Sequence, residues 1–191
     1  MSSSSAFPTK PAFIHRGTWD DETRAHPAMK WMEEFTLNFN RRGGWEEART
    51  DWHSDDFSLV KSDGTEVRGH EPAWEQVKAM YGFFTSELHE PYLLVCWETD
   101  DGWEMLGQAN FYANCVGGDE KSSGERQQQQ KKVKDLQGRE WDVKIPSAFR
   151  FVYVKTDAAA HGGIELKRCE IMSDSMPAVQ ILMQRGVNIN Q

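Results

Sequence analysis

The second half of the chain repeats the two-residue alternation of β-strands along four long stretches. Apolar and polar residues alternate within each stretch. Asp100-Asp101-Gly102 and His161-Gly162-Gly163 suit the tight turns of antiparallel hairpins. The predicted strands are Glu87–Glu98, Trp103–Cys115, Glu140–Lys155 and Ile164–Met172. Long strands joined by short turns constrain the chain to a mostly antiparallel sheet, one face of which needs helices to cover it.

A helical period precedes these strands. Pro27 stands in the first turn of the predicted helix, and the basic and glycine residues at 41–44 end it. A short second helix is expected at Trp45–Trp52. The apolar stripe of the first helix consists of Ala28, Met32, Phe35 and Phe39.

A short hairpin and another helix complete the first half. Phe57–Val60 and Thr65–Arg68 are predicted strands around the Ser62-Asp63-Gly64 turn, and Pro72 opens the helix. A last short helix is expected after Asp174, which is placed to cap it. The apolar face of the helix opened by Pro72 consists of Trp74, Val77, Tyr81 and Phe84.

The polar segments set the expected domain boundaries. Residues 1–24 are rich in serine, proline and charge, and we expect a flexible N-terminal arm there. Residues 25–191 are predicted to form a single domain. Within it, residues of about 117–139 read as a flexible insertion that contains the glutamine run Gln127–Gln130.

The net charge, the cysteine spacing and the aromatic content limit the partners, the compartment and the kind of core that we expect. The formal net charge of −8 disfavours nucleic acid and anionic membrane surfaces. Cys96, Cys115 and Cys169 have neither zinc-like spacing nor a disulfide pattern, so we expect a reducing, cytoplasmic location. Eight tryptophans and ten phenylalanines are many for 191 residues and indicate an aromatic core or an apolar pocket.

Several motifs, in this order along the chain, resemble the SnoaL-like branch of the nuclear-transport-factor-2-like superfamily. They are Trp45-Glu46-Glu47, Ser54–Phe57, Gly69–Ala73, His89, and Cys169–Asp174 followed by Pro177. The resemblance implies an α+β fold in which a strongly curved, cone-shaped sheet wraps around the N-terminal helices. It also implies one deep apolar pocket for a small hydrophobic molecule and a homodimer formed through the sheet. Relatives of this kind include isomerases, dehydratases, epoxide hydrolases and polyketide cyclases, and others that only bind or dimerise.

The catalytic residues of known enzymes of this superfamily are matched to different extents by the residues of this chain. The base of ketosteroid isomerases would fall near Lys61 and its partner acid near Ser147. The arginine–aspartate pair of limonene epoxide hydrolase is broken after Arg150. The strand histidine of scytalone dehydratase resembles His89, whereas its tyrosine and aspartate at the end of the first helix would fall near Asn40 and Arg41.

The resulting hypothesis is a cofactor-free enzyme, without a metal, that dehydrates, isomerises or cyclises a polyketide- or terpenoid-like metabolite. His89 is its candidate acid or base, because a pocket can bring such a group toward neutral pH. Asp174 is a candidate base or orienter of a base. If their strand face is concave, Tyr112 is a candidate catalytic residue and polar anchor that stabilises an enolate, and Asn110 is a candidate polar anchor for the substrate. The expected apolar walls are Phe35, Trp74 and Tyr81.

Each of these roles has a structural alternative. His89 is compatible with a half-exposed strand entrance, and Asp174 with a helix cap. The polar residues that alternate along one strand are compatible with an outward or dimeric face; they are Gln108, Asn110, Tyr112 and Asn114. Trp74 and Tyr81 are compatible with simple core packing. The alternative function is therefore a non-catalytic ligand-binding or dimerisation module of the same fold.

Overall fold

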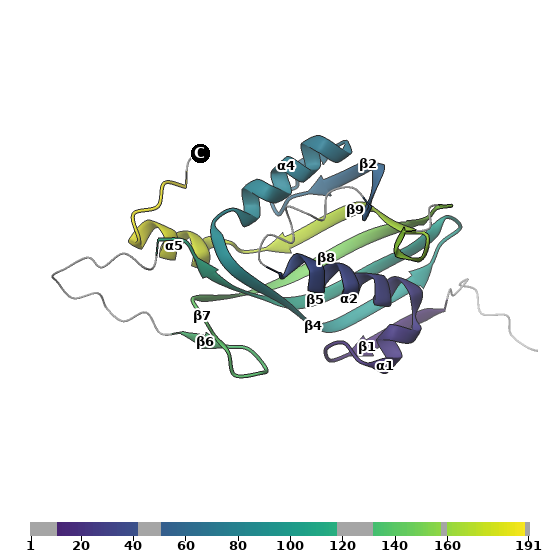
Figure 1. Ribbon diagram of the computed structural model, residues 1–191, viewed down its shortest axis with the longest axis horizontal. Coiled ribbons are helices and arrows are strands. Elements are labelled where there is room, and N and C mark those ends of the chain that lie inside the picture. The colour runs from purple at the N-terminus through teal and green to yellow at the C-terminus, as the bar shows by residue number, and fades with distance from the viewer. Residues whose placement is uncertain (1–10, 42–50, 118–131, 158–159, 190–191) are drawn as a thin grey trace, which may run out of the picture.

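The computed structural model describes residues 11–41, 51–117, 132–157 and 160–189 (Figure 1). Its helices are α1 (Asp21–Ala25), α2 (Pro27–Phe39), α4 (His70–Tyr81) and α5 (Met176–Gln184), with a 3-10 turn at Ala160–Gly162. Its strands are β1 (Ala12–Arg16), β2 (His53–Val60), β3 (Glu66–Arg68), β4 (Phe84–Glu98), β5 (Gly102–Cys115), β6 (Val133–Lys134), β7 (Glu140–Trp141), β8 (Val143–Lys155) and β9 (Ile164–Ser173). Within these described ranges, no helix is both long and apolar enough to cross a membrane.

Seven strands form one sheet in the order β1-β4-β5-β8-β9-β2-β3. All neighbouring pairs are antiparallel except β2 and β9, which run parallel. The predicted α+β class and mostly antiparallel sheet are confirmed. The strong cone-like curling is not, because the sheet is open and ends in the short edge strands β1 and β3 (Figure 1).

Helix α2 crosses one face of the sheet and supplies much of the core (Figure 1). His26 caps it by accepting a hydrogen bond from the Met29 amide, and Pro27 needs no donor in the first turn. Trp31 is buried and donates its indole N–H to the Ile164 carbonyl at 2.9 Å. This contact fixes the helix against the start of β9.

The described part of the predicted flexible N-terminal arm contains the strand β1 and the start of α1. β1 pairs with β4 at the sheet edge, and Asp20 caps α1 by accepting hydrogen bonds from the Glu22 and Thr23 amides. An edge strand depends on a partner about 80 residues away along the chain, so local composition does not reveal it. Residues 1–10 of the predicted arm lie outside the described residues.

Part of the predicted flexible insertion is also folded. β6 and β7 form a small hairpin around Asp135, whose carboxylate accepts hydrogen bonds from the Gln137 and Arg139 amides and from Trp141 Nε1. The glutamine run lies outside the described residues, as does most of the helix predicted at 45–52.

The remaining boundaries differ from prediction by a few residues. β2 begins at His53 rather than Phe57, and β4 begins at Phe84, which the sequence pattern assigns to the helix now seen as α4. The turn after β2 is as predicted, and Gly64 adopts a φ of +82°, which favours glycine.

Candidate functional site

A cavity of about 510 Å³ lies between the inner face of the sheet and helices α2, α4 and α5. Its walls are mostly apolar and aromatic, which suits an apolar small molecule. Three predicted wall residues, Phe35, Trp74 and Tyr81, line it, and so does the candidate acid or base His89. The sequence therefore identified four groups that the fold brings to one cavity.

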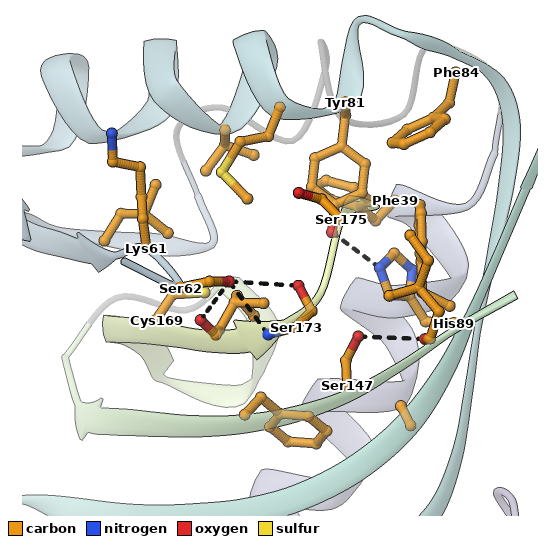
Figure 2. Close-up of a pocket in the computed structure, with 18 of the residues that line it drawn as sticks. Phe39, Lys61, Ser62, Tyr81, Phe84, His89, Ser147, Cys169, Ser173 and Ser175 are labelled. Atoms are coloured by element: carbon orange, nitrogen blue, oxygen red, sulfur yellow. Dashed lines mark hydrogen bonds between the residues drawn. The ribbon is translucent and has the colours of Figure 1, made fainter. Parts of the chain in front are cut away.

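His89 is held between Asn40 and Tyr81, and Figure 2 shows the contact with Tyr81. Asn40, which follows the last residue of α2, places its Oδ1 atom 2.7 Å from His89 Nδ1 and 3.2 Å from the His89 backbone nitrogen. On the other side of the ring, the Tyr81 hydroxyl lies 3.0 Å from Nε2. The three residues form a continuous hydrogen-bonded chain.

The geometry assigns the direction of each bond in this chain. A backbone N–H can only donate, so the Asn40 atom that faces it is the carboxamide oxygen. The same oxygen accepts from His89 Nδ1, which therefore carries the proton of the neutral ring. Nε2 is then the acceptor, and the Tyr81 hydroxyl donates to it.

Burial keeps both partners uncharged. It lowers the pKa of His89 to about 4, so the imidazole is a neutral base at pH 7. Burial also raises the pKa of Tyr81 far above its ordinary value, and negative charge at Cys169 and Glu87 acts in the same direction. Phe39 and Phe111 pack around the imidazole, with ring centroids 5.8 and 4.9 Å away. The site thus pairs a neutral base with a neutral donor.

A second polar group of the cavity lies on β9 and in the turn after β2 (Figure 2). The Ser62 hydroxyl donates to the Ile171 carbonyl at 3.2 Å and accepts from the Ser173 amide at the same distance. Lys61 and Ser147 also line the cavity. These groups can hydrogen-bond a ligand oxygen.

Tyr112 and Asn110 face away from the cavity. Their neighbours Ala109 and Phe111 line it, and successive strand side chains point to opposite faces. Tyr112 instead packs against Trp141 of the small β6–β7 hairpin, with ring centroids 6.3 Å apart. The condition on which the polar-anchor prediction rests, a concave face, is not met.

Asp174 is exposed and does not line the cavity. Its Oδ1 accepts a hydrogen bond from the Met176 amide at 2.9 Å, in the turn that leads into α5. The structure therefore separates Asp174 from His89 and favours the structural alternative.

Asn40 is the neighbour of His89 that sequence reasoning missed. The resemblance to scytalone dehydratase points to this position but requires a different residue type, so the amide counts as a mismatch there. An amide oxygen nevertheless orients the histidine as a carboxylate would, without a charge. The position of Asn40 at the end of the first helix, rather than its residue type, is therefore the sequence feature that points to the site.

One group in the described part of the chain has metal-ligand geometry. His15, Asp20 and Glu22 place their ligand atoms within 4.8 Å of one another. His15 Nε2, however, lies 2.8 Å from the Thr18 carbonyl, and Asp20 caps α1. These atoms are already engaged in holding the β1–α1 turn.

No protein-family model matches the chain, and no curated protein matches its sequence. Solved structures do match. Aln2 from a Streptomyces species has a TM-score of 0.56 at 13% identity, covering 86% of this chain and 99% of Aln2. The hexachlorocyclohexane dehydrochlorinase LinA-type3 from Novosphingobium barchaimii gives 0.53 at 12%, covering 81% and 91%. A candidate scytalone dehydratase from Novosphingobium aromaticivorans gives 0.53 at 11%, covering 81% and 86%.

These likenesses show a shared fold. They bear out, at the level of the fold, the resemblance drawn from the sequence motifs, and the same fold occurs in a candidate polyketide cyclase. At such low identity they say nothing of this chain's reaction.

Proposed function

We propose that the chain is an enzyme that eliminates a small group from a hydrophobic, oxygenated molecule, or moves a proton within one. The observation that carries this proposal is the Asn40–His89–Tyr81 chain at the wall of an apolar cavity. It supplies an acceptor nitrogen and a donor hydroxyl side by side, which is what acid–base catalysis requires.

The proposed step begins when Tyr81 turns its hydroxyl from Nε2 to a ligand oxygen. Nε2 then takes a proton from a carbon next to the leaving group. The C–H electron pair forms the new double bond, the carbon–oxygen bond breaks, and the Tyr81 proton leaves with the oxygen as water. The Nε2 proton returns to the Tyr81 oxygen over the 3.0 Å contact, which restores both groups. Isomerisation and cyclisation use the same first transfer.

The neutral surroundings support this division of roles. Nδ1–H is anchored to Asn40, so the ring stays in the tautomer that leaves Nε2 basic. Two solved structures with this fold are named for eliminations, a dehydrochlorinase and a candidate dehydratase. That likeness of fold makes elimination the first reaction to test.

The alternative function is a carrier of an apolar ligand. The hydrogen bond between the Tyr81 hydroxyl and His89 Nε2 favours this alternative, because it already engages both groups in the absence of a substrate. A carrier binds a ligand without converting it, so binding and turnover must be measured separately.

The test uses a panel of hydroxylated and ketonic polyketide-like and terpenoid-like compounds, analysed by mass spectrometry for loss of water or for isomers. Wild-type protein is compared with Tyr81→Phe and His89→Gln. Tyr153→Phe is the control, because that buried hydroxyl contacts Met32 instead of the cavity pair. Turnover by wild type and the control alone supports the enzyme. Binding without turnover by any protein supports the carrier.

We also propose that two copies pair through the outer face of the sheet. Leu106 on β5 is 42% exposed on that face and lies opposite Arg150 on β8, within a network that includes Glu104 and Glu170. Sedimentation analysis of wild type and Leu106→Glu tests this. A dimer that the substitution dissociates is expected, and a wild-type monomer would contradict the proposal.

A further inference from the structure

Glu87 is a buried carboxyl group that the proposed reaction does not use. It lies on β4 two residues before His89, and it pairs with Ala113 as His89 pairs with Phe111. The two side chains therefore extend from the same face of the strand. Glu87 is 6% exposed, and its Oε1 atom is buried without a hydrogen-bond partner. A carboxyl group left in this state is costly, which suggests a role.

The charge of Glu87 acts on Tyr81, the hydrogen-bond partner of His89. Burial raises the pKa of Glu87 to about 7, so the group changes charge near neutral pH. When ionised, it raises the pKa of Tyr81, the last residue of α4, the helix that directly precedes β4. Besides Tyr81 and His89, the titratable groups among the described residues that line this cavity are Lys61, Asp63 and the Cys169 thiol on β9, whose pKa burial raises to about 12. Helix α2 is followed by the neutral Asn40.

We propose that Glu87 is a positioning residue that sets the base strength of His89 by its own ionisation, without touching the substrate. Its negative charge favours the imidazolium ion that forms during turnover and disfavours the phenolate of Tyr81. Asn40 orients the ring but carries no charge, so Glu87 takes the electrostatic part of a histidine–carboxylate pair. The consequence for catalysis rests on the proposed function, whereas the coupling itself does not.

The sign of the coupling follows from the charges. Below neutral pH Glu87 is protonated, and His89 is a weak base in an apolar site. Above neutral pH the Glu87 anion raises the pKa of His89, and we expect the base to become about tenfold stronger. The reaction should therefore accelerate as pH rises through the titration of Glu87.

Nuclear magnetic resonance of the His89 ring tests the coupling without a substrate. The ring signals are assigned by their loss in His89→Phe and followed across the neutral pH range. In wild type we expect an inflection at about pH 7, where Glu87 titrates, although His89 itself stays neutral. Glu87→Gln should remove the inflection. Glu90→Gln is the matched control, because Glu90 is buried on the same strand but bonds the Leu136 amide.

Three results would overturn the proposal: flat His89 signals in wild type, an inflection that survives Glu87→Gln, or one that Glu90→Gln removes. If Glu87→Gln does not fold, the carbon-13 signal of the Glu87 carboxyl group in wild type decides. A midpoint near 7 supports the proposal, and a midpoint near the ordinary 4.5 contradicts it. A clear inflection in a protein that converts nothing would leave the coupling intact and refute only the proposed enzyme.

Discussion

The Asn40 carboxamide oxygen lies 2.7 Å from His89 Nδ1 and 3.2 Å from the backbone nitrogen of the same residue. One acceptor thus engages two donors of His89, one from the ring and one from the main chain. This double contact fixes the tautomer and orientation of the imidazole from a residue 49 positions away in sequence. The acid–base proposal depends on it, because only this tautomer leaves Nε2 free to accept a proton.

Replacing Asn40 by aspartate should turn the neutral contact into a charged one. A carboxylate beside the imidazole favours its protonated form, so the pKa of His89 should rise from about 4 by about one to three units. The ring titration measured by nuclear magnetic resonance gives this shift directly.

Asn38→Asp is the control for that substitution. It places the same charge in the last turn of α2, where it meets the same helix dipole, but Asn38 contacts Arg41 rather than His89. The pKa of His89 should then stay near its wild-type value. Equal shifts in both variants would mean that Asn40 acts only through general electrostatics.

Removing the Tyr81 hydroxyl should affect chemistry more than stability. We expect Tyr81→Phe to reduce turnover by roughly 10²- to 10⁴-fold, the usual contribution of general acid catalysis. The lost hydrogen bond should lower the free energy of unfolding by only about 0.5–1.5 kcal/mol. Tyr153→Phe should lower stability alone. Undiminished turnover in Tyr81→Phe would remove Tyr81 from the reaction.

His53 should make the fold sensitive to acid. Burial and, second, the neighbouring His70 lower the pKa of His53 from 6.5 to about 3. Between these two values the unfolded chain therefore binds a proton at this residue that the folded chain does not. The free energy of unfolding should fall on acidification over this range, by up to about 1.4 kcal/mol per pH unit for the residue.

The matching measurement is denaturant unfolding of wild type and His53→Phe at several pH values. Phe57 and Trp74 already surround the position, with ring centroids 4.4 and 5.0 Å from the imidazole. The variant should show a shallower pH dependence. The same slope in both proteins would show that His53 is not the acid-sensitive group.

Asp135 should hold the β6–β7 hairpin together. Its carboxylate accepts from the Gln137 and Arg139 amides, both at 2.9 Å, and from Trp141 Nε1 at 3.0 Å. An amide keeps only one accepting oxygen, so Asp135→Asn should loosen the hairpin by about 1.5–3 kcal/mol. Hydrogen exchange of amides 133–141 should then accelerate. Leu136→Ala, at an exposed neighbouring site, should change little, and equal acceleration in both would refute the role of Asp135.

The sequence predicted the features that follow from local periodicity, namely the buried face of α2 and the long strands. The stripe of Ala28, Met32, Phe35 and Phe39 lies on α2, where Phe35 and Phe39 reach the cavity, because a helical stripe reports burial directly. Alternation likewise located the long strands. Alternation does not reveal which of the two strand faces points inward. It therefore led to the prediction of Tyr112 as a site residue, whereas the neighbouring Phe111 lines the cavity.

What escaped prediction depends on contacts between distant segments. β1 is a strand only because β4 offers it an edge. Asn40 belongs to the site only because the end of α2 meets β4 at His89. Glu87 is an ordinary polar residue at a strand entrance in the sequence, and its burial with an unpartnered Oε1 atom is what makes it unusual.

The most direct test of the account is whether the cavity beside His89 accepts an apolar small molecule. Thermal shifts with the compound panel should be compared for wild type, Ala109→Phe and Gln108→Phe. Ala109 lines the cavity and its phenylalanine would fill it, whereas Gln108 points to the other sheet face. We predict that the same compounds raise the melting temperature of wild type and Gln108→Phe but not of folded Ala109→Phe. Equal stabilisation of all three proteins, or of none, would contradict the account.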